Sequence, residues 1–142
     1  MTKTDAAELE RMTGAIVHSA FKLHVALGPG LLESVYEMAL ARDLERQGLG
    51  VRRQMPISFE YDGMHFENAF RVDIVVRDAV LVEIKSVEAR SPVHFKQLLT
   101  YLRLMNMPIG LLINFGEPTF KEGIRRVINS RSVHVPGLTR AT

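Results

Sequence analysis

Between Val51 and Ser86 the chain carries alternating, β-branched segments that are typical of neighbouring strands. Val51 to Tyr61 and His65 to Val76 flank Asp62-Gly63, a dipeptide that favours a two-residue hairpin turn. Ala79 to Ser86 is a third extended segment, rich in Val and Ile. We therefore expect an antiparallel group of strands in the middle of the chain.

Apolar residues three or four apart predict helices before and after these strands. The expected elements are helices at 6–27 and 31–47, a helix opened by Ser91-Pro92, a buried strand at 109–115 and an amphipathic helix at 120–128. Gly28-Pro29-Gly30 separates the first two helices, because Gly accepts the left-handed conformation of a helix end and Pro cannot continue a helix. The predicted fold class is α/β, with a central mixed sheet flanked by helices.

The composition indicates one packed domain without thiol chemistry. With 142 residues, 46% hydrophobic and 24% charged, we expect a single domain at 1–142 with a core of about 6–130. The absence of Cys excludes redox chemistry and thiolate metal sites. The polar N-terminal residues and the lack of a long apolar stretch predict a cytoplasmic protein with no membrane partner. A net charge of +2 permits a polyanionic partner without requiring one.

Strand alternation divides the second and third expected strands into an apolar and a polar face. The apolar residues expected together in the second strand are Val72, Ile74 and Val76. Glu83 and Lys85 share the polar face of the third strand, and with the hairpin tip at Asp78 they are joined there by Asp73. This register requires a loop with an odd number of residues, because a two-residue loop moves Asp73 to the opposite face. On spacing alone, a solvated outer face with an ordinary Glu-Lys pair is the simpler interpretation.

Opposed carboxylates repel, so Asp73 and Glu83 on one face need a compensating charge. A divalent cation supplies it, and Mg²⁺ typically binds one or two carboxylates while it keeps positions for water or phosphate oxygens. Lys85 would then lie where it can orient a water or neutralise charge on a phosphate. The three residues therefore form a candidate phosphodiesterase site.

Two helices add polar residues to this candidate site. Glu33, Tyr36 and Glu37 lie on one stripe of the second helix, and Gln97 and Tyr101 share a face of the third. For either Tyr taken singly, partial packing in the core is the simpler interpretation.

Several motifs, in order along the chain, resemble the GxxExxY protein family. They are Gly30 to Tyr36, Gln54 with Pro56, Arg71 to Asp73, Val82 to Ser86, Gln97 to Leu102 and Gly110 to Gly116. The similarity covers roughly residues 16 to 127, and ordered, separated motifs are more specific than any one of them. That family is placed in the PD-(D/E)xK nuclease-like superfamily, whose restriction-endonuclease-like core is a mixed sheet with flanking helices.

The resemblance implies roles for the polar residues and a divalent-metal-dependent nuclease acting on DNA, with RNA also compatible. The implied metal ligands for Mg²⁺ or Mn²⁺ are Glu33, Asp73 and Glu83, the implied catalytic residues are Asp73, Glu83 and Lys85, and the implied substrate-positioning residues are Gln97, Tyr101 and Tyr36. The chain departs from the superfamily pattern at Val72, where a Pro precedes the Asp in many members.

Two other classes of function stay open at this point. One is a non-catalytic nucleic-acid-binding module that keeps the nuclease fold, and the other is a partner-binding protein, such as a homodimer. Scattered basic residues are candidate phosphate contacts: Arg52, Arg53, Arg90, Lys96, Arg103, Arg125 and Arg126. Only their clustering on the face of the site would favour binding over simple solvation.

Overall fold

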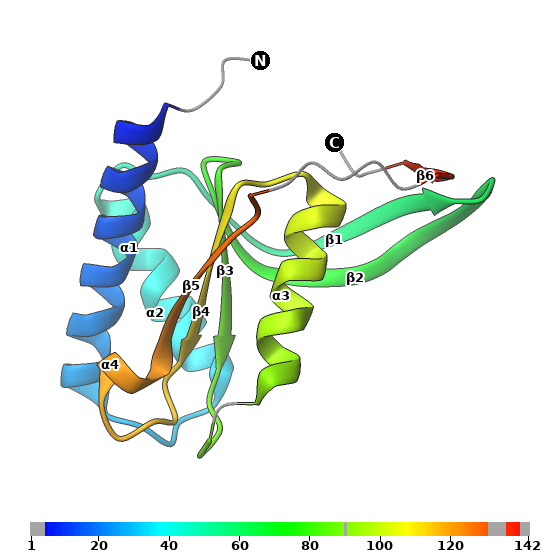
Figure 1. Cartoon of the computed structure of the whole chain (residues 1–142). Helices are drawn as coiled ribbons and strands as arrows, with labels where there is room; N and C mark the ends of the chain where they lie inside the picture. Colours follow the sequence, from blue (N-terminus) through cyan, green and yellow to red (C-terminus); the bar gives the residue numbers. More distant parts are fainter. Residues whose placement is uncertain (1–4, 90, 131–135, 140–142) are drawn as a thin grey trace.

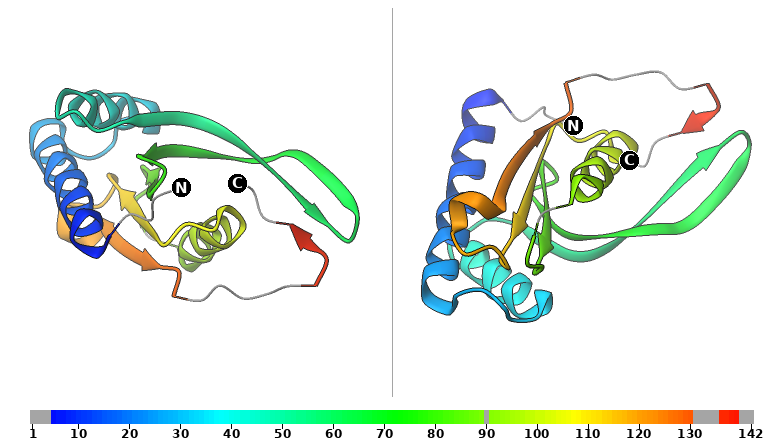
Figure 2. Two further views of the ribbon diagram at one scale, coloured as in Figure 1. Left: turned by 90° about the horizontal axis from the view of Figure 1, so that it is seen from above. Right: turned by 60° about the horizontal axis from the view of Figure 1, so that its bottom comes forward.

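The structure is a computed structural model that describes residues 5–89, 91–130 and 136–139. Its elements, in chain order, are α1 (Ala6–Leu27), α2 (Glu33–Arg46), β1 (Val51–Tyr61), β2 (Met64–Val76), β3 (Val80–Lys85), α3 (Pro92–Met105), β4 (Ile109–Asn114), α4 (Phe120–Gly123), β5 (Ile124–Ile128) and β6 (Leu138–Thr139). Helices cover both faces of one sheet, with α1 and α2 on one side and α3 on the other (Figures 1 and 2).

The sheet has the strand order β5-β4-β3-β2-β1-β6. Strands β3 and β4 are parallel and are connected through α3, whereas the other neighbouring pairs are antiparallel. A parallel pair needs such a crossover connection, and a helix is the usual form that it takes. The predicted fold class, a mixed sheet flanked by helices, is therefore confirmed.

Two apolar clusters occupy the two sides of the sheet. The cluster below α1 and α2 contains Ile16 and Leu40 with the strand residues Ile74 and Ile84. The other cluster lies below α3 and is formed around Leu98 and its neighbours. Gly110 allows this close approach, because a Cβ atom there would lie 3.0 Å from Leu98 Cδ1.

The hairpin between β2 and β3 has the register that the sequence predicts. Its loop comprises the three residues 77–79, an odd number, and Ile74 pairs with Val82. Arg77 and Asp78 both adopt positive φ, 50° and 53°, to make the turn. The two-residue turn at Asp62-Gly63 between β1 and β2 is also confirmed, since Tyr61 pairs with Met64.

The expected grouping of Val72 with Ile74 and Val76 is wrong. Ile74 and Val76 belong to the cluster below α1 and α2, but Val72 belongs to the cluster below α3. Strand β1 shows the same change, since Val51 packs on the first side and Met55 on the second. The pairing register of β1 and β2 is unchanged across this point. Both strands therefore exchange their faces together, between residues 53 and 55 of β1 and between 72 and 74 of β2.

Beyond this exchange, residues 55–72 of β1 and β2 form a two-stranded arm that extends away from the rest of the sheet (Figure 1). Within the arm the register shifts between Ile57 and Phe59, and Asn68 adopts a φ of 50°. Strand β6 pairs with β1 close to the tip of the arm. Within the described residues, no helix combines the length and the apolar character needed to cross a membrane.

The expected helix at 120–128 is wrong beyond its first turn. Helix α4 ends at Gly123, and Ile124 to Ile128 form β5, an edge strand antiparallel to β4. A Cβ atom at Gly123 would lie only 2.1 Å from the carbonyl oxygen of Asn114, so the chain passes tightly beside the end of β4. The β-branched residues Ile124 and Val127 suit the extended conformation that the edge of the sheet offers.

Candidate functional site

The candidate site lies where β2 separates from β3. The pairing of the two strands ends at Ile74 and Val82. Asp73 precedes Ile74 in β2 and is the first residue beyond the last pair. Instead of a backbone carbonyl, the Asp73 carboxylate accepts the hydrogen bond from the backbone N–H of Ile84, with 2.8 Å between Oδ2 and N. The main-chain ladder is thus replaced by a side chain, and the acidic group of Asp73 is held at the fork of the sheet.

Glu83 is buried beside Asp73 without a hydrogen-bond partner for one of its oxygens. Its residue is only 5% exposed, and its Oε1 atom is buried and unpaired within the described part of the chain. The pKa of Glu83 is raised to about 10, mainly by burial and then by the nearby Asp73 carboxylate, whereas Lys85 acts in the opposite direction. Native proteins rarely leave a buried polar atom unsatisfied, so this oxygen calls for an explanation.

Lys85 is the last residue of β3 and follows Leu81 and Glu83 on the side of the sheet that faces α3. Its half-buried ammonium group lies near enough to Glu83 to lower the pKa of that carboxyl. The chain after Lys85 is fixed on two sides. The Ser86 hydroxyl donates to Leu31 O at 2.5 Å, and the Asn114 side chain bonds both backbone groups of Val87 at 3.0 Å.

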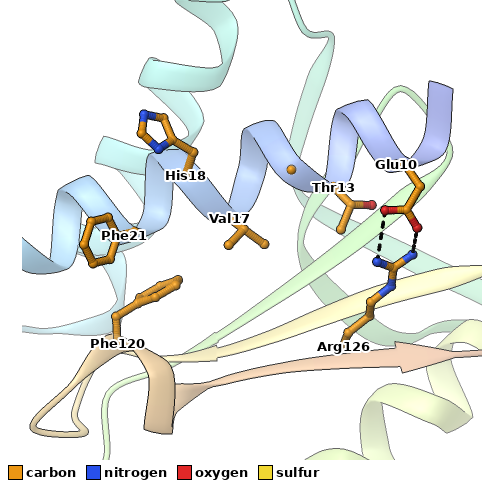
Figure 3. Close-up of a pocket in the computed structure, with 8 residues that line it drawn as sticks. Glu10, Thr13, Val17, His18, Phe21, Phe120 and Arg126 are labelled. Carbon is orange, nitrogen blue, oxygen red and sulfur yellow. Dashed lines mark hydrogen bonds and ion pairs between the residues drawn. The ribbon is translucent and has the colours of Figure 1, made fainter. Parts of the chain in front are cut away.

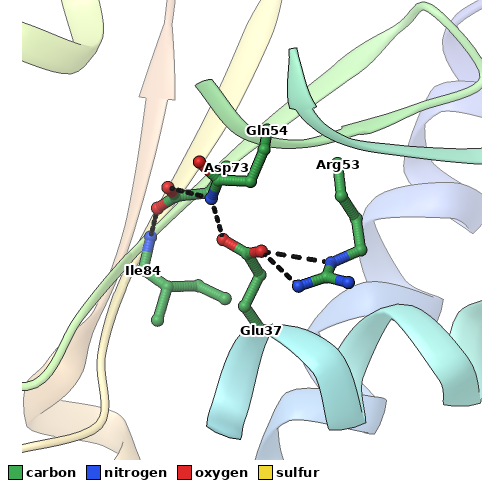
Figure 4. Close-up of polar contacts among 5 residues, drawn as sticks. All are labelled: Glu37, Arg53, Gln54, Asp73 and Ile84. Atoms are coloured by element: carbon green, nitrogen blue, oxygen red, sulfur yellow. Dashed lines mark hydrogen bonds and ion pairs between the residues drawn. The ribbon is translucent and has the colours of Figure 1, made fainter. Parts of the chain in front are cut away.

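A polar network from α2 and β1 reaches Asp73 from the other side (Figure 4). The Gln54 amide nitrogen donates to Glu37 Oε1 at 2.6 Å and, over a longer 3.3 Å, to Asp73 Oδ1. Arg53 donates from Nε and Nη2 to Glu37 Oε2, at 3.1 and 2.7 Å. Glu37 is only 4% exposed, so its charge is balanced by these donors alone among the described residues.

Sequence reasoning did not assign Glu37, Arg53 or Gln54 to the site. Glu37 was noted only as a member of the stripe that carries Glu33. The available signal was that Glu37 follows Glu33 by one helical turn, so that both acids face the same direction from α2.

The structure places Glu33 and Tyr36 differently from the other predicted residues. Glu33 is exposed in the first turn of α2. Tyr36 is fully buried, stacks on Phe115 with 4.3 Å between ring centroids, and bonds Gly28 O and Leu31 N through its hydroxyl. These contacts hold the turn between α1 and α2, so we assign Tyr36 a structural role in place of the expected contact with substrate.

Helix α3 brings the second predicted Tyr to the site. Tyr101 stacks on Phe70 of β2 with 4.2 Å between centroids and 11° between ring planes. Partial burial raises the pKa of its phenol, and the negative charges of Glu83 and Asp73 raise it in addition. Gln97 is exposed one turn earlier on the same helix.

The chain was compared with family models, with curated proteins and with solved structures. The model of the PD-(D/E)XK nuclease superfamily matches residues 10–127, which include every element from α2 to β4. The chain belongs to the PD-(D/E)XK nuclease superfamily. No match was found among the curated proteins or among the solved structures.

Membership of the PD-(D/E)XK nuclease superfamily indicates which chemistry the residues at the fork of β2 and β3 should be compared with. The superfamily signature pairs an Asp with a Glu-x-Lys strand, and Asp73, Glu83 and Lys85 fit that pattern in the sequence. Their assignment as the signature residues stays a prediction. A nucleic acid is the class of substrate that this superfamily implies. The narrower GxxExxY assignment stays a prediction, because the match is to the superfamily as a whole.

The donor set at the fork fits a hard divalent cation of the kind that PD-(D/E)XK nucleases use. The fit rests on the unpaired Glu83 Oε1 atom beside a second carboxylate, since such oxygens are the ligands that Mg²⁺ and Mn²⁺ prefer. Among the described residues no group of three or more His, Asp or Glu side chains is placed to hold a metal ion together. Glu33 is therefore not brought into one group with Asp73 and Glu83.

Several of the basic candidates for phosphate contact are engaged elsewhere. Arg52 pairs with Asp78 at the hairpin tip, and Arg125 lies over the Phe95 ring at 4.7 Å. Arg126 pairs with Glu10 at 2.5 Å and closes one end of a groove of about 460 Å³ between α1 and α4 (Figure 3). Arg90 lies outside the described residues. These three arginines therefore have partners away from the fork.

Proposed function

We propose that this chain is a nuclease that hydrolyses phosphodiester bonds of DNA, with RNA as a second compatible substrate, and that it requires Mg²⁺ or Mn²⁺. The observation that carries the proposal is the buried Glu83 carboxyl beside Asp73, with one oxygen unpaired. A buried acid in this position lowers the stability of the folded chain unless a cation binds it. We therefore propose that the buried Glu83 carboxyl serves to bind a cation.

In this proposal Asp73 and Glu83 bind the cation. When bound, such a cation neutralises the phosphate and acts as a Lewis acid toward it. Glu33 stays a proposed third ligand on the strength of the family resemblance, although its side chain is exposed in the structure. Mg²⁺ sites with one or two protein carboxylates are common, so the proposal does not depend on Glu33.

Lys85 has a separate task in the proposed reaction. Its ammonium group lies beside the acidic pair at the end of a strand that is fixed by Ser86 and Asn114. From there it can hold the attacking water by a hydrogen bond and stabilise the negative charge that develops on the phosphate. Gln97 and Tyr101, both on α3, are proposed to contact the substrate.

The decisive test compares wild type with Asp73→Asn and Lys85→Ala in a plasmid-nicking assay with Mn²⁺. We expect wild type to nick the plasmid and both variants to lose activity by about a hundredfold or more. Lys121→Ala and Glu122→Gln are matched controls, because both residues are exposed on α4. Equal cleavage by wild type and the two site variants would contradict the proposal.

The same proteins also test the alternative of a non-catalytic DNA-binding module. That alternative predicts DNA affinity that falls steeply with salt, without cleavage in any metal. A wild-type protein that neither binds Mn²⁺ nor cleaves, but binds DNA in this way, would establish it.

A further inference from the structure

We propose that Gln54 is a positioning residue, which holds the Asp73 carboxylate in the orientation that a cation site needs and is itself held by Glu37 and Arg53. This inference rests on the proposed nuclease function and extends it to residues that touch neither cation nor substrate.

Gln54 adopts a backbone conformation that residues with a Cβ atom disfavour. Its φ is 51°, in the left-handed region, although it lies inside a strand. Its neighbours Arg53 and Met55 keep regular pairing with Ile74 and Val72. The conformation therefore inserts no extra residue and does not alter the register. Its effect is to turn the side chain of Gln54 out of the normal alternation. Inside a strand such a conformation is strained, and strained residues of this kind cluster at functional sites.

The Gln54 side chain uses one nitrogen to contact two carboxylates. An amide –NH₂ has two hydrogens, and here the contacts go to Glu37 Oε1 at 2.6 Å and to Asp73 Oδ1 at 3.3 Å. The first contact is short, so Glu37 fixes the amide, and the amide in turn faces Asp73 (Figure 4). Arg53 holds the far oxygen of Glu37 with two N–H groups, which makes the anchor rigid.

Asp73 is thereby held at both of its oxygens. The Ile84 N–H bonds Oδ2 at 2.8 Å and Gln54 bonds Oδ1. Each carboxylate oxygen has more than one acceptor site, so both keep capacity for a cation while the plane of the group is fixed. Partners that orient a ligand in this way commonly change metal affinity or activity by about ten- to a hundredfold when they are removed.

The experiment uses Gln54→Gly, which accepts the left-handed backbone at no steric cost and removes the side chain with its amide. Asn68→Gly is the matched control, because Asn68 has a φ of 50° in the neighbouring strand and lies in the arm, beyond the network around Asp73. We expect Gln54→Gly to weaken Mn²⁺ binding, measured by calorimetry, by about tenfold, and to lower kcat more than KM, while Asn68→Gly changes neither. Glu37→Gln should weaken Mn²⁺ binding in the same direction by a smaller factor, because it acts through Gln54.

A second readout needs no metal. The amide resonance of Ile84 in ¹⁵N-labelled protein reports the hydrogen bond to Asp73, and Asp73→Asn marks the shift that follows loss of the charge. We expect Gln54→Gly to move this resonance toward the position seen in Asp73→Asn. An unmoved Ile84 resonance together with unchanged Mn²⁺ affinity would overturn the positioning role.

The two readouts keep this inference distinct from the proposed function. If wild type binds no Mn²⁺ and does not cleave, the nuclease proposal fails whatever Gln54 does. If wild type binds Mn²⁺ and cleaves but Gln54→Gly does so equally well, only the role of Gln54 fails.

Discussion

Gln54 of β1 and Asp73 of β2 lie between the same two strand pairs, Arg53 with Ile74 and Met55 with Val72, and both strands exchange the faces of the sheet at this point. Before the exchange, the strands pack against α1 and α2. After it, they pack against α3. Because the exchange leaves Asp73 beside the end of the β2 and β3 pairing, its carboxylate can bond the backbone of β3 and also meet the polar network from α2. The proposed site therefore lies where β1 and β2 change from one face of the sheet to the other.

Glu83→Gln should stabilise the metal-free protein, and more so as the pH rises. The pKa of Glu83 is raised from 4.5 to about 10 in the folded chain. Below its ordinary pKa, Glu83 is protonated in both the folded and the unfolded state. Between the two values only the unfolded state loses the proton, so the stability of wild type falls by up to about 1.4 kcal/mol for each pH unit.

Denaturant titrations in EDTA at about pH 5 and about pH 8 measure this difference. We expect the gap between Glu83→Gln and wild type to widen at the higher pH. The control is Glu122→Gln, an exposed acid on α4. A gap that stays constant with pH would show that Glu83 does not carry a raised pKa.

Mn²⁺ should raise the melting temperature of wild type, because a cation that binds only the folded state stabilises it. At a free concentration about one hundred times Kd the gain is about 2.7 kcal/mol. Differential scanning calorimetry with and without Mn²⁺ checks this. Asp73→Asn should melt at the same temperature in both conditions, and a full Mn²⁺ effect in that variant would exclude Asp73 as a ligand.

Glu33→Gln should lower the affinity for Mn²⁺ less than Asp73→Asn does. The Glu33 carboxylate is exposed, so even as the proposed third ligand it has to give up hydration to reach the cation, whereas Asp73 is already held at the fork. Isothermal titration calorimetry of both variants gives the comparison. Equal losses of affinity would mean that Glu33 moves to join the site when the cation binds.

Tyr36→Phe should destabilise the fold by about 1 to 2 kcal/mol without changing cleavage at a temperature where both proteins are folded. The Phe ring keeps the stacking on Phe115, but the Gly28 carbonyl and the Leu31 N–H lose their shared partner. Urea unfolding measures the loss of stability. Tyr61→Phe serves as the control, since Tyr61 is 46% exposed. Loss of cleavage without loss of stability would restore Tyr36 to the substrate site.

Tyr101→Phe should distinguish the contribution of the ring from that of the hydroxyl group. The ring stacks on Phe70, so the variant keeps this contact and its stability should change by less than about 0.5 kcal/mol. If the hydroxyl contacts substrate, kcat/KM should fall about tenfold, the worth of one good hydrogen bond. Steady-state kinetics on a short DNA duplex measure this, and unchanged kcat/KM would limit Tyr101 to packing.

Much of the fold could be predicted because its determinants are local. The extended segments of β2 and β3, the Asp62-Gly63 turn and the stop between α1 and α2 each follow from residues close in sequence. The exchange of faces that moves Val72 to the other side of the sheet does not. The amphipathic spacing after Phe120 was misleading, because the same apolar positions suit a helix and a short edge strand. Only the open edge of β4 decides for the strand, and a single sequence does not display that edge.

The sequence predicts the acidic residues of the candidate site, but not the residues that hold them in place. Strand alternation and register placed Asp73 and Glu83 together, and the observed hairpin has that register. The role of Gln54 depends on a positive φ in a residue that is not Gly, which leaves no mark in the sequence. Whether Glu33 or Glu37 faces Asp73 depends on how α2 packs on the sheet, where its Leu40 and Leu44 are buried, and a single sequence does not display that packing.

The arm of β1 and β2 also bears on how such a chain can diverge over evolution. Its root at Gln54 and Asp73 is fixed in register, whereas the shift between Ile57 and Phe59 already accommodates unequal strand lengths. Residues inserted or deleted beyond that shift alter the reach of the arm and leave the root unchanged. Inserting or deleting one residue between that shift and Gln54 would move every side chain between them to the opposite face of the strand. Length variation among descendants of this chain should therefore be confined to the outer part of the arm.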